Sequence, residues 1–67
     1  MKKNELRSTM AKYGDNNQTL AQALGITPAA FSVKINGKRA FSVKDISVMI
    51  DRYDLTGDDV TRIFFTS

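Results

Sequence analysis

The stretch that decides the fold is residues 17–36, which read NQTLAQALGITPAAFSVKIN. Before its central glycine, Leu20 and Leu24 lie four residues apart. After the glycine, Phe31 and Ile35 repeat that spacing. Because side chains four residues apart share one face of a helix, each half is predicted to form a short helix with one apolar stripe. The two stripes can then meet in a shared core.

The join between these two helices has the residues that a tight turn needs. Gly25 lacks a Cβ, so it can adopt the left-handed conformation that ends a helix and leave Ile26 free to point into the core. Thr27 can cap the next helix, and Pro28 suits its first position, where no backbone N–H is needed. Ala21 lies on the inner face of the first helix, where steeply crossing helices leave little room. The stretch therefore predicts a helix-turn-helix.

Length and composition exclude several classes of protein. Sixty-seven residues suit a single domain spanning residues 1–67. The absence of cysteine and histidine excludes disulfide bonds, thiolate chemistry and the commonest metal ligands, so we expect no metal and no other cofactor. The apolar runs are far shorter than the ~20 residues of a membrane span, and the residues after Met1 do not form a hydrophobic signal segment. We expect a cytoplasmic protein that does not contact membranes.

The charge balance suits a polyanionic partner. Ten Lys and Arg residues against seven Asp and Glu residues give a formal net charge of +3. This charge matters only if it gathers on one face. Four of the acids fall late in the chain, at Asp51, Asp54, Asp58 and Asp59. We therefore expect a basic first half and an acidic second half.

A first helix is predicted to begin with Asn4 as its N-cap and to end at Gly14. Its buried stripe would consist of Leu6, Met10 and Tyr13.

Two later helices are predicted from a repeated capping pattern. Ser42 is followed three residues later by Asp45, and Thr56 is followed in the same way by Asp59. The helix after Ser42 carries apolar residues at helical spacing, namely Val43, Ile46, Met49, Ile50 and Tyr53. The inner face of the last helix would be Val60, Ile63 and Phe64. Because no stretch alternates as a strand would, the chain is predicted to be all-α with five helices.

These residues resemble the Cro and phage-repressor family of helix-turn-helix proteins, which has the five-helix lambda-repressor-like fold. The resemblance covers most of the chain and is carried by Leu20-Ala21, Leu24-Gly25-Ile26, Phe31 and Asn36-Gly37-Lys38-Arg39. The later half is similar to short regulators of phages and prophages. One departure is that Lys34 and Ile35 stand where many members carry an apolar residue and a glutamate. The resemblance implies a sequence-specific DNA-binding transcriptional regulator, a repressor in the cytoplasm of a bacterial host cell.

In such a motif the second helix lies in the major groove and its first half contacts base edges. With Phe31 and Ile35 pointing inward, a rotation of ~100° per residue leaves five residues on the outer side. These candidate base-contacting residues are Pro28, Ala29, Ser32, Val33 and Asn36. The first turn has no Arg or Gln to read a base with two hydrogen bonds, so we expect specificity to depend on thymine methyl groups and on DNA shape.

Phosphate contacts are expected on both sides of that helix. The first amides of the preceding helix and the loop after residue 36 would both face the DNA backbone. The candidate phosphate-contacting residues are Asn17, Gln18, Lys34, Lys38 and Arg39. The tail Lys2-Lys3 could add a further contact.

The last aromatic residues leave two alternatives open. Phe64 continues the inner stripe, whereas Phe65 falls off it and needs a partner. Phe64 and Phe65 could form a homodimer interface that places two reading helices about 34 Å apart on an operator in double-stranded DNA. Alternatively, Phe65 could fold back over the first helix.

A second functional class is also open. The small apolar surface of residues 28–36 could bind another regulator, which would make the chain a protein-interaction module such as an antirepressor. An enzyme is not expected, because no residues could serve as a nucleophile with its base. Asp58 and Asp59 are adjacent on a helix and so point in different directions, and helix capping explains both.

Overall fold

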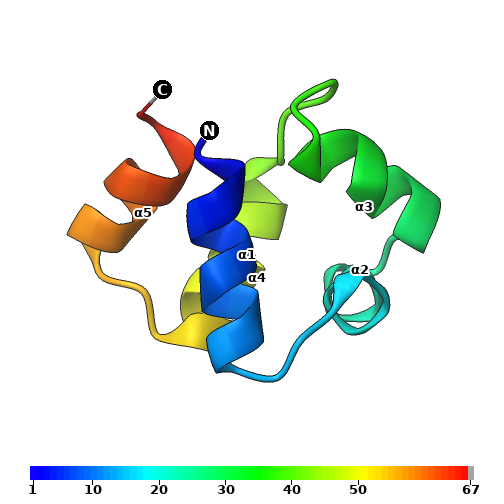
Figure 1. Ribbon diagram of the computed structural model, residues 1–67, viewed down its shortest axis with the longest axis horizontal. Coiled ribbons are helices and arrows are strands. Elements are labelled where there is room, and N and C mark those ends of the chain that lie inside the picture. Colours follow the sequence, from blue (N-terminus) through cyan, green and yellow to red (C-terminus); the bar gives the residue numbers. More distant parts are fainter. Residues whose placement is uncertain (67) are drawn as a thin grey trace.

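The computed structural model describes residues 1–66, which contain five α-helices joined by short connections and no strand (Figure 1). Their bounds are α1 Lys3–Lys12, α2 Asn17–Leu24, α3 Pro28–Ile35, α4 Val43–Tyr53 and α5 Gly57–Phe64. The prediction of an all-α chain with five helices is confirmed. In Figure 1, α5 lies on one side of α1, and the α2 and α3 pair lies on the other.

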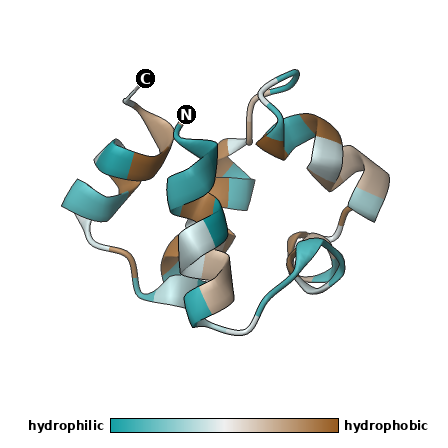
Figure 2. Ribbon diagram, viewed as in Figure 1, coloured by the Kyte–Doolittle hydropathy of each residue, from teal (hydrophilic) through white to brown (hydrophobic). Residues whose placement is uncertain are grey.

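All five helices contribute side chains to one core. α1 packs against α5, and α2 packs against both α3 and α4. Figure 2 shows that the side of α5 that faces α1 is hydrophobic and its outer side hydrophilic. The buried apolar residues are Leu6, Met10, Leu20, Ala21, Leu24, Phe31, Ile35, Met49, Tyr53, Ile63 and Phe64. The two stripes that define residues 17–36 therefore meet in this core, as expected.

The turn between α2 and α3 has the predicted geometry. Gly25 adopts the left-handed conformation with φ of 73°, and the amide of Ile26 donates to the carbonyl of Ala21 at 3.0 Å. The Thr27 hydroxyl accepts from the amide of Ala30 at 3.1 Å, and Pro28 is the first helical residue. Ala21 is fully buried. Together these contacts fix how α3 leaves α2.

Reciprocal capping boxes start three of the helices. Ser42 and Asp45 exchange two hydrogen bonds of 3.0 Å at the start of α4. Thr56 and Asp59 do the same at the start of α5, at 3.0 and 3.1 Å. These two predictions are confirmed. A third box, between Asn16 and Thr19, starts α2.

The start of α1 differs from the prediction. Asn4 is not the N-cap, because α1 begins at Lys3 and the cap position is Lys2, whose side chain makes no capping hydrogen bond. The backbone amide of Lys2 instead donates to the carbonyl of Ile63 at 2.8 Å. A contact with α5 thus ties down the first turn, and no local capping signal was needed.

Two residues of the predicted apolar stripes are exposed. Tyr13 is at the C-terminal end of α1, where its hydroxyl donates to the carbonyl of Tyr53 at 2.9 Å. Its ring is tilted against the Tyr53 ring, with the two centroids 5.1 Å apart. Val43 is 83% exposed. It is the first residue of α4, so it precedes the turns that pack against the core.

Candidate nucleic-acid interface

The outer side of α3 is open to solvent. Pro28, Ala29 and Asn36 are exposed, and Ser32 is half-buried. Val33 is 41% exposed. Four of the five candidate base-contacting residues are therefore exposed and Ser32 is half-buried, and Asn36 directly follows the last residue of α3.

A polar chain links this face to the start of α1. Lys3 Nζ donates to Asn36 Oδ1 at 3.3 Å, and Asn36 Nδ2 donates to Ser32 Oγ at 3.4 Å. The amide nitrogen of Asn36 has a second hydrogen that this bond does not use. Lys3, expected only as part of a free tail, is therefore a residue of the first helical turn and lies beside the end of α3.

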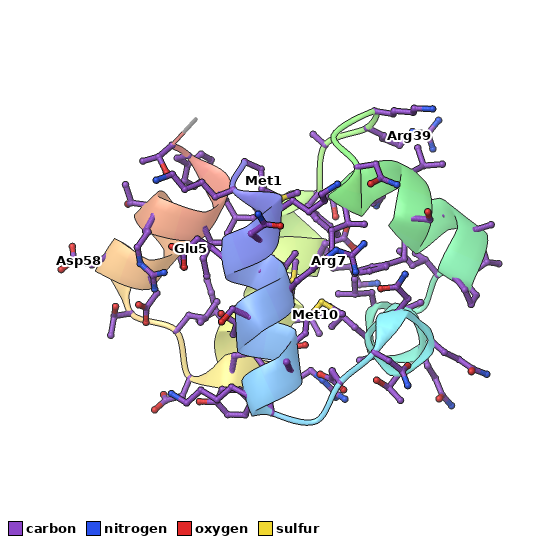
Figure 3. All side chains as sticks on the ribbon, viewed as in Figure 1. Met1, Glu5, Arg7, Met10, Arg39 and Asp58 are labelled. Atoms are coloured by element: carbon purple, nitrogen blue, oxygen red, sulfur yellow. The ribbon has the colours of Figure 1, made fainter. Side chains whose placement is uncertain are left out.

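Arg7, which the sequence did not single out, lies beside the start of α2. Its guanidinium donates to Asn17 Oδ1 at 3.5 Å. Arg7 follows Lys3 by four residues, so both cations lie on one side of α1. In Figure 3, Arg7 extends from α1 toward the side occupied by α2 and α3. The sequence shows that Lys3 and Arg7 are four residues apart. Only the packing of the helices shows that this side of α1 faces α2 and α3.

The start of α2 forms a shallow polar hollow. Asn16 caps the helix, and the amides of Asn17 and Gln18 make no hydrogen bond within residues 1–66. Arg7 lines the same hollow. Free amides at a helix N-terminus beside a guanidinium suit an anion such as a phosphate.

A second cationic segment follows α3. Gly37 has φ of 81°, and the amide of Lys38 donates back to the carbonyl of Val33 at 3.1 Å, which closes the helix. Lys38 and Arg39 are exposed, and neither makes an ion pair or side-chain hydrogen bond with the rest of the described chain. Figure 3 places Arg39 at the outer edge of the molecule, above the end of α3.

Lys34 does not belong with the other candidate phosphate-contacting residues. Its Nζ lies 2.6 Å from Asp45 Oδ2, and the two side chains are only 14% and 5% exposed. Burial raises the pKa of Asp45, but hydrogen bonds from Lys34 and Ser42 outweigh burial and hold that pKa below its usual value. The ammonium of Lys34 therefore neutralises a buried carboxylate of α4. This ion pair corrects the expectation that Lys34 contacts phosphate, because nothing in the sequence indicated Asp45 as its partner.

Asp15 fixes the start of α2 on α4. Its carboxylate accepts two hydrogen bonds of 2.7 Å from Arg52, one of 2.5 Å from Tyr53 and one of 2.8 Å from Thr19. The hydrogen bonds from Arg52 are the main reason that the pKa of Asp15 lies far below its usual value, against the effect of burial. Burial, and then the bond to Asp15, raises the pKa of Tyr53. No sequence pattern indicated this cluster.

The charges divide along the molecule. Residues 1–39 hold seven basic and two acidic residues, whereas residues 40–67 hold three basic and five acidic ones. Within the described residues, the basic side chains in ion pairs are Lys34, Arg52 and Arg62. Figure 3 shows Arg39 and Asp58 at opposite ends of the molecule. Its positive end is therefore the one that carries α3.

The two terminal phenylalanines have different environments. Phe64 is part of the core, as predicted. Phe65 is 70% exposed, so it does not fold back over α1, and that alternative is wrong.

Comparisons with known protein families, with curated proteins and with solved structures found no match to this chain. Nowhere in residues 1–66 do three or more carboxylates gather as a metal site would require. None of the five helices is long and apolar enough to cross a membrane.

Proposed function

We propose that the chain is a sequence-specific DNA-binding transcriptional regulator with a lambda-repressor-like fold, in which α2 and α3 form the helix-turn-helix. One observation carries this proposal. The outer side of α3 is open, and three cations lie near its C-terminal end, Lys3 on α1 and Lys38 and Arg39 in the following loop. Arg7 lies beside the start of α2, and none of these four cations makes an ion pair within residues 1–66. A repressor of the Cro type acts by occupying operator DNA.

The dimensions of α3 suit a major groove. An α-helix with its side chains is about 10 to 12 Å across, and the major groove of B-DNA is about 12 Å wide, so α3 can enter it. With α3 in the groove, the amides of Asn17 and Gln18 meet one phosphate backbone. Lys38 and Arg39 extend beyond the other end of the helix. Base contacts then come from the methyl groups of Ala29 and Val33 and from the polar groups of Ser32 and Asn36.

The proposal predicts a steep dependence of DNA affinity on salt. Each neutralised phosphate contributes a slope of about −0.9 to log K against log salt. The double variant Lys38→Ala, Arg39→Ala should therefore make the slope shallower by about 2 on random duplex, as measured by fluorescence anisotropy.

The control variant is Arg62→Ala, which removes the same kind of charge on α5, where Arg62 makes exposed ion pairs with Glu5 and Asp59. Its slope should match that of the wild type. Equal slopes for the wild type and the double variant would contradict a role of the loop in DNA binding. Selection of sites from a random DNA pool, followed by footprinting, would then define the operator.

A second candidate function is a protein-interaction module that binds another regulator. It is favoured by the small apolar side chains on the outer side of α3, where Val33 is 41% exposed and the first turn has no Arg or Gln. This candidate predicts that the affinity for DNA is low and changes little with salt, and that the chain binds a partner repressor tightly. Both results together would contradict the proposal of DNA binding.

A further inference from the structure

A hollow of about 270 Å³ opens between the end of α5, the loop after α3 and the start of the chain. Most of the residues that line it are apolar, and the rings of Phe41 and Phe64 have centroids 6.0 Å apart in an edge-to-face arrangement. Phe64 is buried and Phe41 is half-buried, whereas Phe65 is exposed. The hollow therefore has an aromatic floor and an opening to solvent.

The charged residues in the lining are both basic. They are Lys34 and Arg39, and none of the described residues that line the hollow is acidic. The two cations differ in how free they are. Lys34 is held by Asp45, whereas Arg39 is exposed and makes no ion pair within residues 1–66. An acidic occupant would therefore meet one free guanidinium at the opening.

We propose that this hollow binds a small aromatic carboxylate, with its ring against Phe41 and Phe64 and its carboxylate on Arg39. An apolar cavity of about 150 Å³ is enough to bind benzene, so the larger hollow has room for a ring with a short acidic chain. Aromatic rings favour edge-to-face contact with an inserted ring. A guanidinium can donate two parallel hydrogen bonds to a carboxylate.

Each part of this ligand class corresponds to a different feature of the hollow. A neutral aromatic compound would leave the charge of Arg39 unused, and a carboxylate without a ring would leave the aromatic floor in water. A cationic aromatic compound would be repelled by the guanidinium. The hollow should therefore prefer a compound that carries both the ring and the negative charge.

Occupation of the hollow has a consequence for DNA binding, and this consequence rests on the proposed function. Arg39 is also a candidate phosphate-contacting residue, and one guanidinium that is paired with a carboxylate is not free to neutralise a phosphate. The ligand and DNA should therefore weaken each other's binding, because a coupling between two ligands is reciprocal. The binding of the ligand itself can be measured without DNA.

Titration of the full chain with phenylacetate, followed by the NMR shifts of its backbone amides, tests the proposal. A compound of this size should bind with a Kd of about 1 mM, and the shifts should be largest around residues 37–41 and 64–65. Phenylacetamide has the same shape without the charge and should bind at least about threefold more weakly. Acetate, which lacks the ring, should cause no saturable shifts up to about 10 mM.

Two variants separate the charge from the apolar contact. Arg39→Gln should weaken phenylacetate at least about threefold and leave phenylacetamide unchanged. Lys38→Gln is the matched control, because Lys38 is the neighbouring exposed cation and does not line the hollow. It should bind phenylacetate as the wild type does. Phe65→Ala removes an apolar group at the edge and should weaken both compounds by the same factor.

Three results would overturn the binding site. These are a wild type without saturable shifts up to about 10 mM phenylacetate, shifts centred away from the hollow, and an Arg39→Gln variant that binds phenylacetate as tightly as the wild type. Circular dichroism should show the variants folded, since each substitution is at an exposed position.

Fluorescence anisotropy on random duplex tests the effect on DNA, with acetate at the same concentration as the reference. Saturating phenylacetate should make the wild-type salt slope shallower by about 1, the contribution of one phosphate contact, and should not change the slope of Arg39→Gln. An unchanged wild-type slope would contradict the competition for Arg39. A chain that binds phenylacetate but no DNA would retain the binding site and lose the proposed function.

Discussion

At the residue scale, the sharp connection between α2 and α3 depends on one backbone conformation. Gly25 has φ of 73°, and a Cβ added there would meet no atom within 4 Å. The requirement for glycine is therefore conformational and not steric. A side chain would fit the space but would strain the backbone.

Gly25→Ala should destabilise the fold by about 1 to 2 kcal/mol, the cost of a left-handed conformation in a residue with a Cβ. Urea unfolding followed by circular dichroism measures this change. Gly57→Ala is the matched control, because Gly57 also has open space around its Cα but no left-handed φ. That variant should be as stable as the wild type or up to about 1 kcal/mol more stable. Equal losses in the two variants would contradict the conformational explanation.

The buried pair of Lys34 and Asp45 also acts at the residue scale. Removing the lysine leaves the buried carboxylate of Asp45 without its counter-charge, so Lys34→Met should cost about 3 kcal/mol of stability. The double variant Lys34→Met, Asp45→Asn should recover part of that loss, because no buried charge then remains. Urea unfolding of both variants checks the order of stability. A Lys34→Met variant with wild-type stability but a shallower salt slope for DNA binding would instead return Lys34 to the phosphate-contacting residues.

At the element scale, the helices are positioned by contacts between polar groups as well as by the core. Asp15 lies in the connection between α1 and α2, and Arg52 and Tyr53 lie at the end of α4. Their hydrogen bonds hold the start of α2, and with it the candidate phosphate site, at a fixed place on α4. The contact between Lys2 and Ile63 plays a comparable role for α1 and α5.

This arrangement predicts that acid weakens the fold. The pKa of Asp15 is lower in the folded chain than its usual value of 3.8, so the folded state binds fewer protons than the unfolded state near that pH. The stability contributed by Asp15 is therefore fully present above about pH 4 and is lost as the pH falls toward the folded pKa.

Asp15→Asn should remove this contribution and flatten the dependence of the unfolding free energy on pH below about 4, as measured by urea unfolding at a series of pH values. Asp58→Asn changes a carboxylate that makes no ion pair within residues 1–66, and it should keep the wild-type profile. A wild-type profile for Asp15→Asn would show that the cluster contributes little.

At the scale of the whole molecule, the basic and acidic ends have different roles in the proposed function. In that proposal, the end with α3 would meet DNA, and the acidic residues of the later helices would stay away from the phosphates. If two copies bind together, the selected DNA should contain two half-sites in inverted orientation, about 10 base pairs apart between centres. The experiment is to select bound DNA sequences from a random pool and to compare them. Selected sequences that contain only one half-site would contradict paired binding.

Much of the fold was predictable because its signals are local. The apolar spacing of Leu20, Leu24, Phe31 and Ile35 identified two helices, and the residues around Gly25 identified their turn. The capping boxes at Ser42 and Thr56 marked two further helix starts. The signal failed at Asn4, because Lys2 contacts α5 through its backbone amide and α1 already begins at Lys3, which places Asn4 inside the helix.

The sequence by itself therefore determined the five helices, the caps of α3, α4 and α5, the turn after α2 and the exposed residues of α3, because each depends on neighbours within about one helical turn. Only the tertiary structure decided which charges are free. Lys34 is neutralised by Asp45, Arg52 is held by Asp15, and Arg7 lies beside Asn17. The partners in such pairs lie 10 to 37 residues apart, and no local pattern records which side chains the packing of helices brings together.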